Sequence, residues 1–390
     1  MKKRAAVLMT ACLLTAAMTG CADPARENAK RTENAEVKAE SVEANSESGS
    51  EKTSQEAVDR KASDFKVAMM IPGNLGDKSF FDASYDSIEL LKNDLGVSVD
   101  YVEAGADISK YHSVYTDLCE QDYDLILTVS SNGDDAMVQA AEEYPDKKFI
   151  NLDDSLTEVP ENVLIMAPKN NEMSYLAGVT AALKAQELGE KQVGFIGGMD
   201  IPGINEFLAG YIEGVQYIDP EIKVATSYVG SFTDTAKGKE NALLLYKSGV
   251  PIIFAAAGQS GLGVIDAAAE KGKLVIGVDS DQAMALKESQ PELAEVVVTS
   301  AIKNIPDEAK MIVDKAMKGD VEYGQRILFG IKDNAVGLAE NEYYEKMMSV
   351  EQRQKVEEVK NGIISGVIKV TDTTGMSTEE LEKIREAARP

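Results

Sequence analysis

Short apolar runs separated by amphipathic stretches begin at Asp64, and this alternation restricts the fold more than any other feature of the chain. The apolar runs are typical of parallel strands, because strands that helices cover on both faces are apolar throughout. The stretches between them have the spacing of surface helices. In this first series we predict strands at residues 65–71, 97–102, 125–129 and 148–152, and helices at residues 79–95, 108–121 and 135–144.

A second series of the same kind starts after Pro168. Two successive series indicate two doubly wound α/β lobes joined by a hinge, and a length of 390 residues agrees with this, since one domain usually has about 100–200. The second series consists of helices at residues 172–188, 202–217, 235–248 and 261–271 and strands at residues 192–196, 222–228, 251–255 and 274–278.

The end of the chain is predicted to return to the first lobe before it finishes in the second. A strand at residues 295–300 and a helix at 306–318 cross back, and a helix at 342–362 lies near the C-terminus. We therefore expect an N-terminal lobe of residues 64–168 plus about 300–325, and a C-terminal lobe of residues 169–299 plus about 326–390.

The first 63 residues have the composition of a targeting segment and a tether. Basic residues precede an apolar run at residues 5–18, which is too short to cross about 30 Å of hydrocarbon, so residues 1–20 are predicted to be a signal peptide. Small residues lead into Cys21 and resemble the bacterial lipobox, whose cysteine is acylated and becomes the new N-terminus. An ordinary signal peptidase site with an incidental cysteine is the alternative.

Residues 22–63 contain no aromatic residue and no Leu, Ile or Met, so the segment 21–63 is expected to be a lipidated cysteine followed by a disordered tether. The protein is thus predicted to be anchored in the lipid bilayer through Cys21, on the extracytoplasmic face of a bacterial cell membrane. Only Cys119 remains in the folded body, so no disulfide is expected within it.

Charge and composition exclude several classes of function. The chain has 40 basic and 66 acidic residues, and the body after residue 63 has 30 and 56 of these, a surface that repels nucleic acid and disfavours anionic ligands. The chain contains one histidine, His112, which excludes histidine-cluster metal sites. No nucleophile has a plausible base, so we expect no enzyme, no metal and no cofactor.

Polar and glycine-rich loops follow the predicted strands. Ligands of doubly wound sheets bind outside the carboxyl ends of the strands, so two lobes that present such loops to each other are expected to form a cleft for a small molecule. The glycine-rich loop 258–263 lacks the Lys-Ser/Thr of a phosphate-binding loop and is interpreted as a strand-to-helix turn. The polar and glycine-rich loops that follow the predicted strands span residues 72–77, 130–135, 197–200, 258–263 and 279–282.

Acidic pairs and phenylalanines stand in or beside these loops. Most such aspartates cap helices or form turns, but an ionised aspartate also accepts hydrogen bonds from vicinal hydroxyls, as on a ribose. Phenylalanines at the loop ends of both lobes could hold a flat ring between them. The pairs are Asp134/Asp135, Asp153/Asp154 and Asp279/Asp281, and the phenylalanines are Phe80, Phe81 and Phe232.

A series of motifs in the body resembles the basic membrane protein (BMP) family, lipid-anchored substrate-binding proteins of ABC importers whose best-understood members resemble purine-nucleoside receptors. The resemblance runs from about Phe65 to the end, and it implies a type I periplasmic-binding-protein-like fold. Its motifs lie, in order, at residues 77–80, 171–178, 193–198, 230–234, 258–263 and 276–282.

The resemblance also implies site residues. Two phenylalanines stack on the purine in nucleoside-binding relatives, and the matching positions are Phe80 and Phe232. The ribose contacts of those relatives match Asp135, Gly258, Asp279 (or Asp281) and Lys303.

Two positions depart from the family pattern. The relatives hydrogen-bond the base through an aspartate where this chain has Ile71 and through an asparagine where it has Phe81. Either the ligand is a different nucleoside-like molecule, or another polar side chain substitutes, for which Asn74, Asp77 and Asn132 are the candidates.

These observations predict a monomeric receptor that captures a nucleoside or nucleoside-like ligand between two lobes and delivers it to an ABC permease in the membrane. A ligand sensor or surface interaction protein that uses the same fold without transport is the alternative. A transcriptional regulator is disfavoured by export and by the absence of a helix-turn-helix segment.

Overall fold

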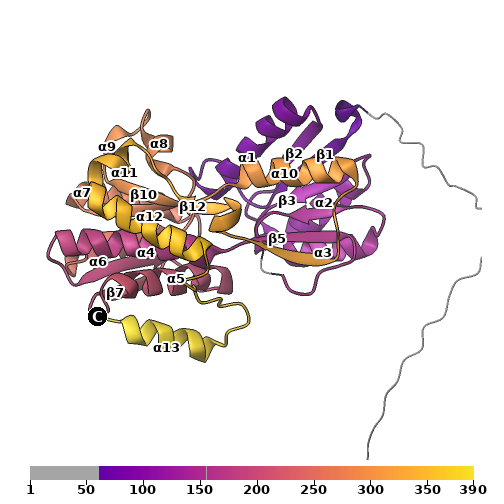
Figure 1. Cartoon of the computed structure of the whole chain (residues 1–390). Coiled ribbons are helices and arrows are strands. Elements are labelled where there is room, and N and C mark those ends of the chain that lie inside the picture. Colours follow the sequence, from indigo (N-terminus) through magenta and orange to yellow (C-terminus); the bar gives the residue numbers. More distant parts are fainter. Residues whose placement is uncertain (1–60, 155) are drawn as a thin grey trace, which may run out of the picture. The chain divides into compact units, whose positions relative to one another are not determined.

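The computed structural model describes residues 61–154 and 156–390. The predicted signal peptide, Cys21 and nearly all of the predicted tether lie outside this part of the chain. The described part of the chain contains two six-stranded sheets (Figure 1). The predicted class, two α/β lobes of mostly parallel strands, is confirmed.

The first sheet is entirely parallel and has the strand order β11-β5-β4-β3-β1-β2. Side chains alternate along β1, so that Val67, Met69 and Ile71 join one apolar cluster while Ala68 and Met70 join another. Helices α1 and α10 cover the first cluster, and α2 and α3 cover the second. The strands are β1 (Lys66–Ile71), β2 (Ser98–Glu103), β3 (Leu125–Thr128), β4 (Phe149–Asn151), β5 (Val163–Pro168) and β11 (Gln325–Phe329); the helices are α1 (Phe80–Leu90), α2 (Tyr111–Cys119), α3 (Asp134–Glu143) and α10 (Ile305–Lys318).

The second sheet has the order β12-β10-β9-β8-β6-β7, and β12 is its antiparallel edge strand. Helices α4, α5 and α12 pack on one of its faces and α6 and α7 on the other, while α11 contributes Tyr344 to the first cluster and Tyr343 to the second. The strands are β6 (Gln192–Gly197), β7 (Lys223–Tyr228), β8 (Ile252–Ala256), β9 (Leu274–Asp279), β10 (Val297–Lys303) and β12 (Val336–Leu338); the helices are α4 (Asn170–Glu187), α5 (Pro202–Ile218), α6 (Thr235–Lys247), α7 (Ser260–Lys271), α8 (Gln282–Leu286), α9 (Pro291–Ala294), α11 (Glu342–Met347) and α12 (Val350–Ile364).

The chain crosses between the sheets after β5, after β10 and after β11. The Glu172 carboxylate joins two of these crossings, because it accepts hydrogen bonds from Lys169 Nζ (2.7 Å) and from the backbone N–H of Ile331 (2.9 Å). These bonds connect the crossing after β5 to the crossing after β11.

Several predicted boundaries differ from the structure. The strand predicted at residues 295–300 does not cross back, because β10 pairs with β9 in the second sheet through Ile302. Strand β11, which was not predicted, extends the first sheet to Phe329, so the last crossings fall at residues 303–305 and 329–336 rather than near 300 and 325. The helix predicted at 342–362 is two helices, since Ser349 caps a new helix with its side chain.

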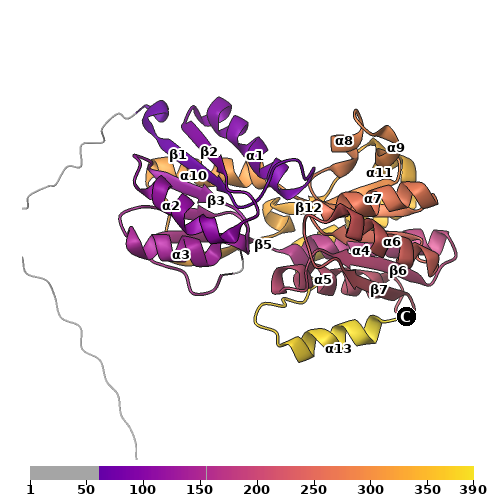
Figure 2. The same cartoon turned by 180° about the vertical axis from the view of Figure 1, so that it is seen from behind.

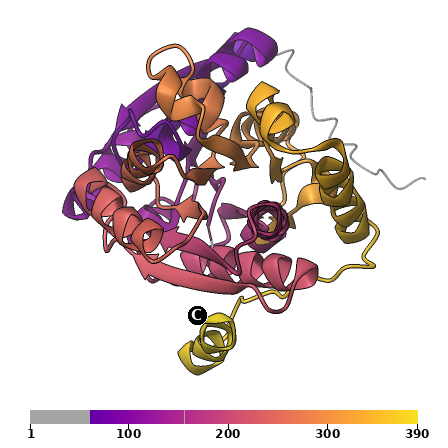
Figure 3. The same ribbon diagram turned by 90° about the vertical axis from the view of Figure 1, so that its left-hand side faces the viewer.

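Helix α13 (Thr378–Ala388) follows an extended segment and packs on the outside of the second lobe, against α5 and β7 (Figures 1, 2 and 3). A capping box between Ser377 and Glu380 starts it. Across residues 61–154 and 156–390, no helix combines the length and apolar character needed to span a membrane.

Candidate ligand-binding site

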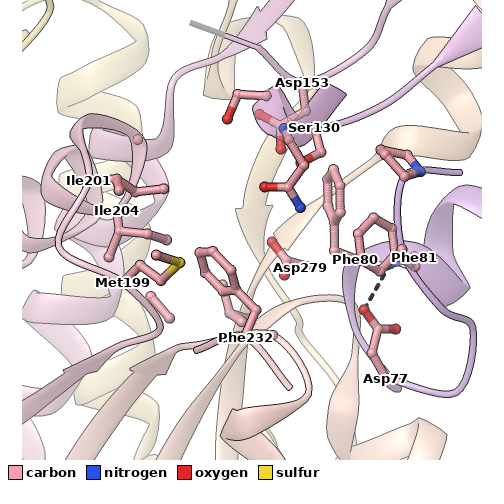
Figure 4. Close-up of a pocket in the computed structure, with 18 of the residues that line it drawn as sticks. Asp77, Phe80, Phe81, Ser130, Asp153, Met199, Ile201, Ile204, Phe232 and Asp279 are labelled. Atoms are coloured by element: carbon pink, nitrogen blue, oxygen red, sulfur yellow. Dashed lines mark hydrogen bonds between the residues drawn. The ribbon is translucent and has the colours of Figure 1, made fainter. Parts of the chain in front are cut away.

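A cavity of about 370 Å³ lies at the carboxyl ends of the strands of both sheets (Figure 4). Loops after β1, β3 and β4 line it from the first lobe, and loops after β6, β7, β8 and β9 line it from the second. These are the polar and glycine-rich loops in which the sequence placed a cleft, and a volume of this size is typical of small-molecule sites.

The cavity brings together seven of the eight predicted ligand-binding residues, namely Asp77, Phe80, Asn132, Phe232, Gly258, Asp279 and Lys303. Asp135 is the eighth, and it is exposed on the first turn of α3 and does not line the cavity. Its neighbour Asp134 has a buried carboxyl oxygen instead, and burial together with the nearby Asp154 raises the pKa of Asp134. Asp281 also lies elsewhere, since it caps α8 and accepts hydrogen bonds from Asn341.

Lys303 forms the electrostatic centre of the site. Its Nζ lies 2.6 Å from Asp153 Oδ2 in the first lobe and 3.4 Å from Asp279 Oδ1 in the second. The same ammonium lies 4.9 Å from the ring centroid of Phe80 and 5.1 Å from that of Phe207. The Lys303 side chain is only 6% exposed, so the two carboxylates stabilise a cation that burial alone would disfavour, and its pKa is raised.

The two lobes also meet beside this cluster. The buried Ser79 hydroxyl donates to Asp279 Oδ2 (2.8 Å), and Ser280 Oγ and Gln282 Nε2 donate to the backbone oxygen of Lys78. Lys78 (φ 51°) and Asp279 (φ 67°) both adopt the left-handed region, which is uncommon for residues other than glycine. Backbone strain of this kind concentrates at binding sites, where surrounding contacts hold it in place.

Phenylalanines stand on opposite sides of the cavity (Figure 4). Phe80 and Phe81 come from the start of α1, with ring centroids 5.4 Å apart, and Phe232 comes from the loop after β7. Glycines permit both placements: a Cβ on Gly73 would lie 2.2 Å from the Phe81 ring, and one on Gly198 would lie 2.3 Å from the Phe232 ring.

Asp77 positions the first-lobe phenylalanines by capping α1. Its carboxylate accepts backbone N–H bonds from Ser79, Phe81 and Asp82. Burial raises the pKa of Asp77 to about 6, although these three donors act in the opposite direction. Both of its oxygens are therefore engaged within the protein.

Several residues that line the cavity were not predicted from the sequence. Met199, Ile201 and Ile204 form an apolar wall next to Phe232 (Figure 4). Glu206, whose pKa burial raises to about 7, accepts a hydrogen bond from Asn170 Nδ2 (3.2 Å). The loop after β6 was recognised as a candidate but its apolar residues were not, while Glu206 and Arg326 lie inside a helix and a strand, where no local pattern marks them.

Comparison with known proteins agrees with this geometry. Residues 65–374 match the model of a family described as ABC transporter substrate-binding protein, PnrA-like. The chain belongs to the Bmp family. The resemblance to basic membrane proteins seen in the sequence is thereby confirmed, and the family consists of solute-binding proteins and not of enzymes.

Two relatives and one solved structure illustrate the membership. Basic membrane protein D of Borreliella burgdorferi is 31% identical over 317 residues, which cover 80% of this chain and 89% of the relative. The ABC transporter nucleoside-binding protein BmpA of Lactococcus lactis is 32% identical over 323 residues, which cover 79% and 89%. A solute-binding protein of an Aeropyrum pernix ABC transporter system has a TM-score of 0.71 at 25% identity and covers 83% of this chain and 99% of its own.

Proposed function

We propose that this Bmp-family protein is a lipid-anchored receptor that captures a nucleoside or nucleoside-like molecule in the cavity and delivers it to an ABC permease. The observation that carries the proposal is the arrangement of aromatic rings on opposite sides of one cavity, beside a buried cluster of Asp153, Lys303 and Asp279. A flat ring and a polyhydroxyl group on one molecule match these two regions.

The ring of the ligand would lie between Phe80 and Phe232. Stacking on aromatic faces tolerates many bases, because every base has a π-face. The polar edge of the base lacks the two hydrogen-bonding residues of the relatives. Ile71 is fully buried in the core of the first lobe, and Phe81 presents a ring to the cavity. Neither can hydrogen-bond a purine.

Two of the three polar candidates for that edge are asparagines. Asn74 and Asn132 line the cavity and are exposed, and within the described part of the chain their side-chain amides form no hydrogen bond. Asp77 was the third candidate, but its oxygens already accept three backbone N–H groups. We propose that Asn74 or Asn132 contacts the base.

The hydroxyls of the sugar would meet Asp153, Asp279 and Lys303. A carboxylate accepts hydrogen bonds from vicinal hydroxyls, and an ammonium donates to them. The lining contains five carboxyl groups, from Asp77, Asp153, Asp154, Glu206 and Asp279, against the two cations Lys303 and Arg326. This excess of acid favours a neutral nucleoside over a nucleotide.

The test is isothermal titration of the purified protein with a panel of purine and pyrimidine nucleosides and with guanosine monophosphate. We expect heat for at least one nucleoside and weaker binding of the monophosphate. No heat and no thermal shift for any nucleoside would exclude the ligand class, and tighter binding of the monophosphate would contradict the charge argument.

A further inference from the structure

Residues 375–390 lie beyond the part of the chain that matches the family model, and they include α13. The C-terminal half of this helix is held to the second lobe. Ile384 and Ala388 pack against the core of that lobe, and Lys223 Nζ donates to the backbone oxygen of Ala387 (3.2 Å). The segment that leads into it is fixed by Thr371, whose N–H donates to Glu213 (3.0 Å) and whose oxygen accepts from Asn171 (2.8 Å).

One side chain of α13 reaches a loop of the ligand cavity. Arg385 donates through both terminal nitrogens to Asp200, at 3.1 and 2.6 Å, and through Nη2 also to Asn205 Oδ1 (2.6 Å). Its guanidinium lies 5.2 Å from the ring centroid of Tyr228 and bonds to the hydroxyl of that residue (2.9 Å). The Arg385 side chain is 18% exposed, so the contact is largely sheltered from solvent.

Asp200 and Asn205 belong to the segment that builds one side of the cavity. Asn205 Nδ2 donates to Asp200 Oδ1 (2.9 Å), and Tyr228 donates to Asn205 Oδ1 (2.7 Å), so the four side chains form one network. Around them, Met199, Ile201 and Ile204 line the cavity, and Gly198 lies directly under the Phe232 ring.

Backbone hydrogen bonds hold the start of this loop at Gly198, whereas side chains hold Asp200. Gly198 is tied to the sheet, since its N–H bonds to Ala256 and its oxygen accepts from Gly230 and Ser231. Beyond Gly198, the Asp200 side chain is bonded only to Asn205 and Arg385 within the described residues. Ile201 is also held by the backbone N–H of Asn205, which donates to its oxygen (2.9 Å), so the network contributes most to the position of residues 199 and 200.

We propose that Arg385 is a positioning residue for the ligand cavity. Through Asp200 and Asn205 it holds residues 198–204, which comprise the loop after β6 and the start of α5, in place. The cavity wall is then set from outside the family-matched region, by a helix that itself contributes no lining residue. A planar guanidinium suits this task because it can bond a carboxylate, an amide oxygen and an aromatic face at once.

The first test needs no ligand. Hydrogen–deuterium exchange of the purified ligand-free protein compares wild type with Arg385→Ala. Lys383→Ala is the matched control, because Lys383 lies on the same helix, is 70% exposed and, among the described residues, pairs only with Glu379. We expect exchange within residues 199–204 to become about three- to tenfold faster in Arg385→Ala and to stay unchanged in Lys383→Ala.

A second variant tests whether detachment of α13 alone explains the effect of Arg385→Ala. Asp200→Asn leaves Arg385 in contact with Asn205 and Tyr228, and it should still accelerate exchange in the loop, by a smaller factor. Equal exchange in wild type and Arg385→Ala would overturn the proposal. So would acceleration spread evenly over the second lobe, since that would mark a general structural role.

The effect on binding rests on the proposed function and is measured separately. Titration with the nucleoside that binds wild type best should show about three- to tenfold weaker affinity in Arg385→Ala, and Arg385→Lys should recover only part of it. Unchanged affinity in Arg385→Ala would also overturn the proposal. If wild type binds no nucleoside, the proposed function fails, and the exchange experiment still decides the role of Arg385.

Discussion

The hydroxyl of Ser79 donates a 2.8 Å hydrogen bond to Asp279 Oδ2, and this bond joins the start of α1 in the first lobe to the end of β9 in the second. Both residues are buried, and the same Asp279 carboxylate faces Lys303. The bond therefore couples contact between the lobes to the charge cluster of the cavity.

Replacement of Ser79 by alanine should destabilise the protein. The buried Asp279 oxygen loses a donor, and an unsatisfied buried polar group costs about 1–3 kcal/mol. Urea denaturation measures the loss. Ser113→Ala is the control, because in the part of the chain that the structure describes its exposed hydroxyl bonds only to the backbone of Lys110. Equal stability of the two variants would show that the contact between Ser79 and Asp279 contributes nothing.

Replacement of Lys303 by methionine should cost more. The change leaves Asp153 and Asp279 facing each other without their shared cation, and breaking a buried ion pair costs about 3–5 kcal/mol. Lys239→Met is a matched control, since Lys239 also lies between two carboxylates but at the surface, where such pairs contribute about 0–1 kcal/mol.

A double variant separates stability from binding at this cluster. Lys303→Met combined with Asp153→Asn removes the repulsion, so thermal melting should recover part of the lost stability. Nucleoside binding should be lost in Lys303→Met and should not return in the double variant, because two of the three groups proposed to bind hydroxyls, Asp153 and Lys303, are altered. Recovery of binding in the double variant would refute their role.

Phe232→Ala should weaken ligand binding by on the order of 1–3 kcal/mol, the usual contribution of a base stacked on an aromatic ring. Phe232→Leu keeps an apolar side chain beside Gly198 but removes the ring face, so it should lose most of the same affinity. Titration calorimetry with the best nucleoside measures both. An affinity equal to wild type would mean that the Phe232 ring only packs against the loop.

The pH dependence of stability should change in Glu308→Gln. Burial raises the pKa of Glu308 to about 8, and repulsion from Asp153 adds to this. One of its carboxyl oxygens is buried and has no hydrogen-bond partner among residues 61–154 and 156–390. The folded state therefore holds this proton more tightly than the unfolded chain, so the stabilisation is complete at low pH and is lost as the pH rises toward about 8.

Glutamine imitates the protonated carboxyl at every pH. Glu308→Gln should match wild type near pH 5 and be more stable by on the order of 2 kcal/mol near pH 8, as measured by urea denaturation. Glu89→Gln, at an exposed position on α1, is the control and should show no such trend. A stability difference that is constant with pH would contradict the titration of Glu308.

Cys21→Ala tests the predicted lipid anchor. Wild-type protein expressed in bacteria should incorporate a labelled fatty acid and sediment with membranes, whereas Cys21→Ala should incorporate none and appear in the extracytoplasmic soluble fraction. Cys12→Ala is the control and should behave as wild type. Labelling that persists in Cys21→Ala would exclude this cysteine as the acylated residue.

The fold class was readable from the sequence because parallel strands covered on both faces are apolar throughout, and helices between them keep one apolar stripe. The elements with few buried residues, β11 and α13, could not be predicted in this way. Strand β11 carries Gln325 and Arg326 and has no buried residue, as expected for an edge strand, so its pairing with β5 could not be predicted from hydrophobicity. Helix α13 is short and mostly exposed, so the hydrophobic pattern did not indicate it either.

The loop positions of the site could also be predicted, because the carboxyl ends of parallel strands must meet along one edge. The pattern of the sequence thus predicted the two lobes, the loops of the cleft and the phenylalanines beside them, Phe80 and Phe232, whereas Lys303 was implied by the resemblance to the Bmp family. Only the tertiary structure decided that Asp153 and not Asp135 lines the cavity, that Asp77 caps α1, and that Arg385 reaches Asp200. These are contacts between residues far apart in the chain, and the direction of a side chain at a helix start depends on packing that no local pattern contains.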